Sequence, residues 1–325
     1  MKSQHVDLEL PLVQSDFKSL PNICRFPHPA MATTFEVIIE HEDAVYARQA
    51  ADAAFAELDK IEAELSRFIE NSDISRLNNL PAGESLLLGP DAFDCLQLSV
   101  QMCTQTNGAF DVTVGQLLTC WLNDDRGLRS PSNDELTFAR EHSGMHLLRL
   151  DCEHCTVELQ TGPIKIDLGG IGKGYAVDRM AELLRQWSID TALIHGGFSS
   201  VLALAPPAGT AGWPVTVSHP RAPKEILAKL FLRRRALGAS GLRRGSHIIN
   251  PRTARPVKNM IAAWSCAADA AVADALSTAF MVMSPAEIEQ YCLAHPDTSS
   301  IVMTAEDNSQ KGGILRFNRF FRAEP

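Results

Sequence analysis

Hydrophobic and polar positions along the chain follow two periods, one typical of helices and one typical of strands. Apolar residues recur at helical spacing across residues 44–66 and again across 91–105, which predicts two amphipathic helices. A third helix, rich in small residues, is expected over 268–283. Clusters of β-branched and aromatic residues predict strands. The strands expected on this basis are 32–40, 191–194, 226–240, 301–304 and 314–317.

The middle of the chain joins a short apolar run to a glycine-rich segment. Residues 164–168 are typical of a buried strand, and glycines recur through 169–174 before a helix expected at 175–187. Because a strand is expected at 191–194, this order predicts a βαβ-like unit. The polar segment 72–79 is expected to be a loop with a short turn. The whole pattern indicates a mixed α/β (α+β) fold.

Composition is that of an ordinary globular protein. The 325 residues, 45% apolar and 21% charged, suffice for one large domain or for two lobes that share a cleft. Residues 1–25 are polar and lack a clear period, so we interpret them as an N-terminal extension and 26–325 as the domain. A formal charge of −9 argues against nucleic-acid binding. Because neither a membrane span nor a signal peptide is evident, we expect a cytoplasmic protein.

Eight cysteines are spread along the chain, and we interpret them as free thiols. One group of nearby side chains has the ligand types that zinc prefers. Its members are His142, His146, Cys152 and Cys155. However, residues 152–155 separate two alternating apolar runs, 145–150 and 156–159, as a hairpin turn does. We favour the turn and keep zinc as the alternative, which metal analysis would test.

The glycine-rich segment is the strongest candidate for chemistry. Glycines allow backbone N–H groups to approach an anion closely, and the N-terminus of the following helix adds a partial positive charge. Lys173 adds a full positive charge. Together these groups suit a diphosphate, although the spacing is neither that of a Walker A loop nor that of a Rossmann fingerprint. The alternative is a tight turn that only allows helix and strand to pack.

Asp274 and Thr278 are the second candidate, because residues four apart on a helix share one face. A carboxylate and a hydroxyl there are hard oxygen ligands that suit Mg²⁺. The alternative is an Asp that pairs with an arginine elsewhere. His247 is the third candidate, since a histidine can accept a proton from a hydroxyl, although a lone histidine is more often structural. The Gly-x-Ser-x-Gly pattern of serine hydrolases is absent.

These features occur in an order that resembles the ApbE-like FAD:protein FMN transferase family. The resemblance runs from about Met31 to Thr304 and rests on six motifs in family order. They are Met31-Ala-Thr-Thr-Phe; Leu65-Ser-Arg-Phe with Ser72-Asp-Ile-Ser-Arg-Leu-Asn78; Gly108-Ala-Phe-Asp-Val-Thr-Val-Gly-Gln-Leu; Ile166-Asp-Leu-Gly-Gly-Ile-Gly-Lys-Gly-Tyr-Ala-Val-Asp178; Ser240-Gly241 with His247-Ile-Ile-Asn-Pro-Arg-Thr253; and Ala273-Asp-Ala-Leu-Ser-Thr278.

The resemblance implies a T-fold-like architecture, a single large domain with two lobes and a flavin cleft. It implies that Mg²⁺ is held by Asp274, Thr278 and the carbonyl of Gly170. It also implies FAD contacts at a set of residues along the cleft. They are Met31, Phe68, Ala109, Phe110, Asp111, Lys173 and His247.

The implied reaction transfers FMN from FAD to a Thr or Ser hydroxyl of an acceptor flavoprotein and releases AMP. His247 is the candidate that receives the hydroxyl proton, and Asp274 acts through the metal. Two alternatives remain open at this point. The first is Mg²⁺-dependent cleavage of FAD to FMN and AMP with water as acceptor, and the second is a FAD-binding protein without catalysis.

Four positions depart from the family pattern. Ala32 and Ala254 stand where the family has Gly. Phe198 stands where Asp or Asn is common, and Asn250 replaces the usual Asp. We expect these departures to bear on acceptor recognition and rate, while the metal pair and Lys173 are retained.

Overall fold

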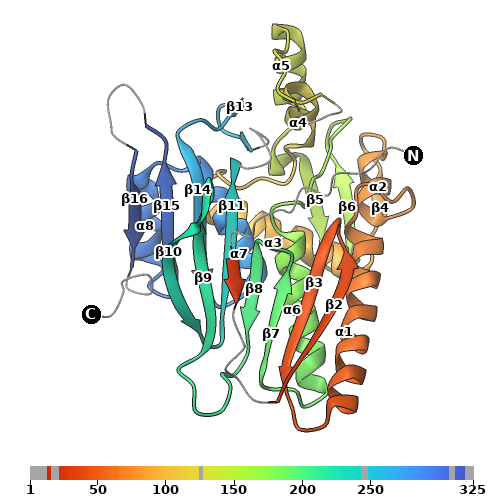
Figure 1. The fold of residues 1–325 in the computed structure, drawn as a ribbon. Coiled ribbons are helices and arrows are strands. Elements are labelled where there is room, and N and C mark those ends of the chain that lie inside the picture. The colour runs from red at the N-terminus through yellow and green to blue at the C-terminus, as the bar shows by residue number, and fades with distance from the viewer. Residues whose placement is uncertain (1–12, 16–21, 124–126, 243–247, 307–311, 319–325) are drawn as a thin grey trace, which may run out of the picture.

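A computed structural model describes residues 13–15, 22–123, 127–242, 248–306 and 312–318, and it is built around one eight-stranded sheet (Figure 1). Every neighbouring pair in this sheet is antiparallel. Its strands, in spatial order, are β16 (Ile314–Phe317), β15 (Ser299–Thr304), β14 (Met260–Ala267), β11 (Arg235–Gly241), β8 (Ser200–Ala203), β7 (Ala192–Gly196), β3 (Thr33–Glu40) and β2 (Ile23–Ala30).

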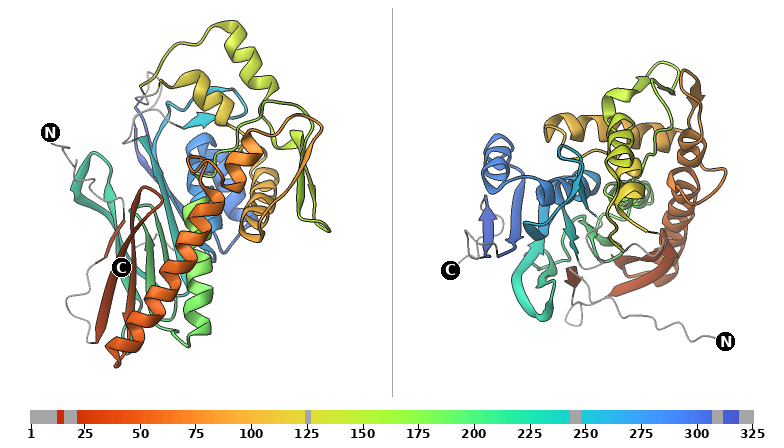
Figure 2. Two further views of the ribbon diagram at one scale, coloured as in Figure 1. Left: turned by 90° about the vertical axis from the view of Figure 1, so that its right-hand side faces the viewer. Right: turned by 90° about the horizontal axis from the view of Figure 1, so that it is seen from above.

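A layer of helices covers one face of this sheet (Figure 2). Helix α7 (Ala270–Val282) packs on β11 and β14, α6 (Gly172–Gln186) on β7 and β8, and α1 (Ala44–Leu65) on β2. Their apolar faces are fully buried, as at Leu58 and Phe280. Further helices around this layer are α2 (Asp73–Asn78), α3 (Pro90–Gln105) and α8 (Pro285–Ala294). The burial of these apolar faces stabilises the layer.

A three-stranded sheet stands against the other face (Figure 1). It consists of β1 (Val13–Ser15), β9 (Trp213–His219) and β10 (Ala222–Leu232). A second apolar core lies between the two sheets, and its largest fully buried side chains are Trp213 and Trp264. The central sheet is therefore covered on both faces, which explains why β7 and β8 are buried along their whole length.

Smaller elements surround one end of the sheet. They are β4 (Ser85–Leu87), β5 (Leu148–Asp151), β6 (Thr156–Leu159), β12 (Ile249–Asn250), β13 (Arg255–Pro256), α4 (Gly115–Trp121), α5 (Asn133–Glu141) and the short 3-10 turn η1 (Met145–Leu147). β5 and β6 form the expected hairpin, with residues 152–155 in its turn. In the described ranges no three His, Cys, Asp or Glu side chains are placed to hold a metal ion. The thiol of Cys152 instead accepts a hydrogen bond from Gln97 at 3.4 Å.

The mixed α/β fold is confirmed, but its predicted βαβ-like unit is wrong. Residues 164–168 form no strand, and Lys165 makes only a single bridge to Val114. Ile164 and Ile166 are nonetheless buried, so their apolar pattern reflects burial rather than sheet pairing. The segment 72–79, expected as a loop, contains helix α2, whose N-terminus is capped by the Ser72 hydroxyl.

Two strands lie in or begin within residues 1–25, the segment interpreted as an extension. β2 begins at Ile23, inside the segment interpreted as an extension, and pairs with β3 along its length. β1 pairs with β9. Pro27 and Pro29 conceal β2 in the sequence, because proline is rare in strands except at sheet edges, which is where β2 lies.

Within the same described ranges, no helix is long and apolar enough to cross a bilayer.

Candidate active site

The glycine-rich segment ends in helix α6 earlier than the sequence predicts. The helix begins at Gly172, so Lys173 lies in its first turn. The Lys173 ammonium donates to the carbonyl of Gly169 at 3.2 Å. The N–H of Gly169 donates to Asp167 at 2.8 Å, and Arg67 pairs with the other oxygen of that carboxylate at 3.3 Å. This chain of contacts fixes the loop in front of the helix N-terminus.

Helix α7 meets α6 at backbone contact. A Cβ at Gly174 would overlap the carbonyl of Ala270, and a Cβ at Gly238 would overlap the carbonyl of Ala273. Two glycines therefore allow α7 to approach α6 on one side and β11 on the other. This close packing sets the position of the next residue on α7, Asp274.

Asp274 is 2% exposed, and its Oδ2 accepts the N–H of Gly174 at 3.1 Å. The Lys173 ammonium lies 4.0 Å from the same oxygen. Burial raises the pKa of the Asp274 carboxyl, while Lys173 and the Gly174 N–H act in the opposite direction. A buried carboxylate whose neighbouring cation stands at the limit of an ion pair is well suited to a further cation.

Thr278 lies one helical turn beyond Asp274 and faces the glycine loop. Its hydroxyl is 3.1 Å from that of Ser240, which is 2.8 Å from that of Ser277. A Cβ at Gly170 would lie 3.0 Å from Thr278 Oγ1 and 3.3 Å from the ring of Phe110. The structure thus brings together five of the predicted residues: Gly170, Lys173, Asp274, Thr278 and Phe110.

The other predicted residues lie around this centre in different ways. Phe68 is 75% exposed and stacks under the Arg67 guanidinium at 4.6 Å, so the Arg67–Asp167 pair connects it to the glycine loop. Ala109 is buried beside Phe110. His247, the predicted proton acceptor, lies outside the described residues.

Asp111 accepts hydrogen bonds from its own segment and from the backbone of Met145. Its Oδ1 accepts the N–H of Thr113 at 2.7 Å and the Thr113 hydroxyl at 2.6 Å. Burial raises the pKa of the Asp111 carboxyl, against the effect of these hydrogen bonds.

Met31 and Ala32 form the two-residue turn of the β2–β3 hairpin, with φ of 49° and 56°. This is the turn type that needs positive φ at both central residues. Ala254 also has a positive φ, of 54°. The two alanines that replace family glycines therefore both stand in the left-handed region.

The other two departures from the family pattern are Asn250 and Phe198, of which the first preserves a turn contact and the second changes the polarity of a turn. Asn250 Oδ1 accepts the N–H of Arg252 at 2.9 Å, a turn-forming bond that an Asp carboxylate makes equally well. Phe198 follows Gly197 in the β7–β8 turn and is 41% exposed. It places an apolar ring where the family often has a polar side chain.

Sequence reasoning missed the residues that support the centre. Asp178 accepts the N–H groups of Ala270 and Ala271, each at 2.8 Å, from the neighbouring helix. Ser240 was not expected to contact Thr278, nor Ser277 to contact Ser240. The available signal was the small residues of the two helices, Gly and Ala in α6 and Ala and Ser in α7, which indicate close backbone approach but not which helices meet.

Fold and site together define the class of protein. The ApbE family model matches residues 31–302, most of the chain, and the chain belongs to the ApbE family. It is similar to the FAD:protein FMN transferase of Escherichia coli strain K12, with 24% identity over 275 residues, covering 80% of this chain and 78% of the relative.

Solved structures resemble the fold along nearly its whole length. The ApbE protein of Thermotoga maritima has a TM-score of 0.81 and 27% identity, covering 93% of this chain and 100% of that one. The flavinyl transferase ApbE of Pseudomonas stutzeri in its apo form has a TM-score of 0.82, covering 93% and 98%. Its 23% identity supports the shared fold alone.

Proposed function

We propose that the protein transfers FMN from FAD to a Thr or Ser hydroxyl of an acceptor flavoprotein, with Mg²⁺ as cofactor and AMP as the second product. The observation that carries this proposal is the meeting of the glycine loop, Lys173 and the Asp274–Thr278 pair at one point. Family membership and relatives named FAD:protein FMN transferase support the same reaction class.

The donor set fits Mg²⁺. Asp274 supplies a buried carboxylate, Thr278 a hydroxyl on the same helix face, and Gly170 a backbone carbonyl in the adjacent loop. These are hard oxygen ligands, and Mg²⁺ commonly completes its shell with phosphate oxygens and water. When bound, Mg²⁺ would neutralise charge on the diphosphate of FAD.

The chain's own residues would then orient the flavin nucleotide. The Lys173 ammonium, in the first turn of α6 and beside the loop carbonyl of Gly169, would bind phosphate oxygens, and the positive end of the α6 dipole would favour their negative charge. Phe110, in contact range of Gly170, would pack on the bound nucleotide, with Met31, Phe68, Ala109 and Asp111 lining the rest. His247 remains our candidate to accept the proton of the acceptor hydroxyl.

Mass spectrometry tests the proposal directly. The purified protein is incubated with FAD, Mg²⁺ and a flavoprotein domain that carries an acceptor Thr, and the domain is examined for covalent FMN. Asp274→Ala should abolish transfer, whereas Asp52→Ala, an exposed change on α1, should leave it unchanged. A second variant, His247→Ala, should abolish transfer and retain FAD binding.

Other outcomes identify the alternatives. AMP released without an acceptor, with no FMN attached when one is present, indicates a FAD-cleaving hydrolase. FAD bound without any AMP indicates a binding protein. The division into residues 1–25 and 26–325 and the cytoplasmic location stay predictions.

A further inference from the structure

Three hydroxyl groups form a hydrogen-bonded chain beside the proposed metal ligands. Ser277 Oγ donates to the carbonyl oxygen of Asp274 at 2.8 Å. Ser240 Oγ lies 2.8 Å from Ser277 Oγ and 3.1 Å from Thr278 Oγ1. The chain therefore begins at the backbone of one proposed ligand residue, Asp274, crosses from α7 to β11 at Ser240 and ends at the hydroxyl of the other, Thr278.

The direction of each hydrogen bond in this chain follows from the number of hydrogens. A hydroxyl has one hydrogen to donate and two lone pairs that accept, whereas a carbonyl oxygen can only accept. The Ser277 hydrogen is used on the Asp274 carbonyl, so the hydrogen between Ser240 and Ser277 belongs to Ser240. The hydrogen between Ser240 and Thr278 then belongs to Thr278. Each of the close contacts receives a hydrogen only in this order.

The packing of α7 on β11 fixes the distances in the chain. Ser277 is 0% exposed, so water does not compete for its hydrogen. Ser240 is half-buried and lies two residues beyond Gly238 on β11, so both face the same side of the sheet. At Gly238 the backbone of α7 approaches so closely that a Cβ would overlap the Ala273 carbonyl. The Ser240 hydroxyl is therefore held against α7 by the docking of two backbones.

The order of the chain has a consequence for Thr278 as a ligand. Donation to Ser240 leaves the lone pairs of Thr278 Oγ1 available, and this oxygen faces the glycine loop, 3.0 Å from where a Cβ at Gly170 would lie. A cation is attracted by the lone pairs of a hydroxyl and repelled by its hydrogen, so the direction of the hydrogen decides whether Thr278 can bind a metal ion. Hydrogen bonds to metal ligands orient those ligands and raise metal affinity.

We propose that Ser240 and Ser277 are positioning residues, which turn the Thr278 hydrogen away from the metal site. The inference rests on the proposed function, because it concerns the same Mg²⁺ site. Neither serine has to contact the metal or FAD. Without Ser240, the Thr278 hydroxyl loses its acceptor and rotates among orientations that include its hydrogen facing the cation, which lowers the affinity for the metal.

Binding of Mn²⁺ to the full-length protein tests the proposal, because carboxylate, carbonyl and water ligands suit Mn²⁺ as well as Mg²⁺. The EPR signal of free Mn²⁺ is measured with FAD present, and FAD alone is the blank. Ser240→Ala should weaken Mn²⁺ binding about tenfold, as the loss of a hydrogen bond to a metal ligand does. Ser277→Ala should weaken it about threefold, because Ser240 then has a hydrogen that it can direct at Thr278. The double variant should bind like Ser240→Ala, since both serines act through one chain.

Ser300→Ala is the matched control for a purely structural role. Ser300 is also 0% exposed in the central sheet, and it donates to the carbonyl of Trp264 at 2.8 Å. This variant should lower the free energy of unfolding in urea and keep the wild-type affinity for Mn²⁺. If Ser240→Ala behaved in the same way, with lower stability and unchanged affinity, its role would be structural and the proposal would be wrong.

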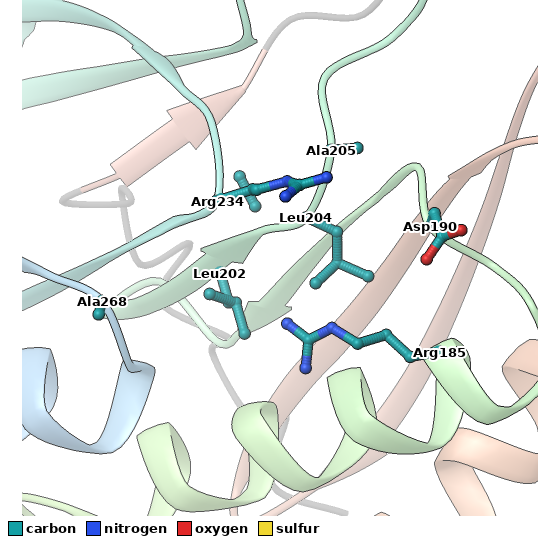
Figure 3. Close-up of a pocket in the computed structure, with 8 residues that line it drawn as sticks. Arg185, Asp190, Leu202, Leu204, Ala205, Arg234 and Ala268 are labelled. Carbon is teal, nitrogen blue, oxygen red and sulfur yellow. The ribbon is translucent and has the colours of Figure 1, made fainter.

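A second control tests for Mn²⁺ bound elsewhere. A pocket of about 310 Å³ is lined by Arg185, near the end of α6, and by the exposed Asp190 (Figure 3). Arg185 is about 18 Å from Lys173 along the helix at its standard rise. Asp190→Asn should therefore bind Mn²⁺ like wild type. Loss of binding in this variant would place the ion in that pocket and contradict the proposal.

The remaining outcomes separate this inference from the proposed function. A double variant weakened by the product of the two single factors would show that the serines act independently, which overturns the chain and leaves the metal site intact. A wild-type protein that binds no Mn²⁺ would overturn the metal site itself, and the inference with it. If Ser240→Ala does not fold, Ser277→Ala provides the same test, and wild-type affinity in that variant would overturn the proposal.

Discussion

Asp178 on α6 and Ala270 at the start of α7 are joined by a 2.8 Å hydrogen bond, so that one helix caps the other. The second carboxylate oxygen accepts the N–H of Ala271. Asp269, the residue at the N-cap position, makes no such bond with its own side chain. The N-terminus of α7 is therefore capped by a side chain of α6, and the orientation of α7, with Asp274 and Thr278 on it, depends on that contact.

Protonation of Asp178 should make stability depend on pH. Burial raises the pKa of its carboxyl to about 7, partly opposed by the two N–H bonds. An unfolded Asp titrates near 4, so the native state holds the proton between about pH 4 and 7. The free energy of unfolding should fall as pH rises through this range, by on the order of 1–3 kcal/mol, and Asp178→Asn should lack this slope.

Urea unfolding at pH 5 and pH 8 measures this effect as the difference between wild type and Asp178→Asn. The prediction fails if that difference is the same at both pH values. Glu289→Gln, an exposed change on α8, serves as the control and should keep the wild-type slope.

Ala32→Gly should stabilise the protein. Ala32 has a φ of 56° in the β2–β3 turn, and the left-handed conformation costs about 1–2 kcal/mol for an L residue with a Cβ. Glycine relieves this cost but loses about 0.5–1 kcal/mol to chain entropy, so a net gain of about 0.5–1 kcal/mol is expected. Thermal unfolding measures it. Ala82→Gly, at an exposed position without positive φ, should instead destabilise.

Ala254→Gly should come close to neutral, although its φ of 54° is nearly the same. The Ala254 methyl is 2% exposed, and burial of one methyl is worth about 0.8 kcal/mol. Relief of strain and loss of packing therefore nearly cancel. If the thermal unfolding midpoint rose as much for Ala254→Gly as for Ala32→Gly, the Ala254 methyl would contribute nothing to packing.

Glu64→Gln should raise stability above neutral pH. Among the residues that the structure describes, buried Glu64 Oε2 has no hydrogen-bond partner. A Cβ built on Gly89 would lie 2.6 Å from Glu64 Oε2 and 3.0 Å from Asp73 Oδ2, so the two carboxylates face the same small space. Burial and the nearby carboxylates of Asp91 and Asp73 raise the pKa of Glu64, so its contribution to stability is lost as pH rises through that pKa. A glutamine amide can donate to Asp73 at any pH, for a gain of about 1 kcal/mol.

Chemical denaturation at pH 8.5 and pH 5 tests the prediction for Glu64→Gln against exposed Glu70→Gln. The gain should be larger at the higher pH and smaller at the lower one, because the raised pKa leaves more of Glu64 protonated as the pH falls. If Glu64→Gln lost stability at both pH values, the buried Glu64 carboxylate would not be the source of the destabilisation.

Arg252→Ala should weaken FAD binding about tenfold. The Arg252 guanidinium donates to the carbonyls of Thr106 and Asn107 at 2.7 and 2.9 Å and pairs with Glu287 at 2.6 Å. It thereby holds the segment that leads into Phe110. Fluorescence quenching of FAD measures the affinity. Arg252→Lys should lose less affinity for FAD than Arg252→Ala, and Arg255→Ala, at an exposed position, should keep the wild-type affinity. Equal affinities for wild type and Arg252→Ala would remove this role.

Long periodic elements could be predicted from the sequence, because their pattern depends on their own residues. The helices at 44–66 and 91–105 are α1 and α3 almost to the residue. Residues 164–168 could not be placed, since a fully buried segment is apolar whether or not it pairs. Strand β14 was missed because its alternation is hidden by burial on both faces.

The candidate site could be predicted where one local segment carries the chemistry. Asp274 and Thr278 share a helix face because of their spacing alone. Lys173 could be predicted because it belongs to the glycine-rich segment itself. The contact of Asp178 with Ala270 joins residues 92 positions apart and depends on how two helices dock, which no local pattern encodes. The same holds for the Ser240–Thr278 contact across β11 and α7.

The prolines of β2 also bear on how the protein behaves at high concentration. β2 is an outer strand of the eight-stranded sheet, and such a strand offers unpaired backbone donors to any passing chain. Pro27 and Pro29 have no backbone N–H, so a strand from another molecule could not form a continuous ladder of hydrogen bonds with β2. Replacing both prolines would expose a continuous template for intermolecular sheet growth, which makes this edge a built-in barrier to aggregation.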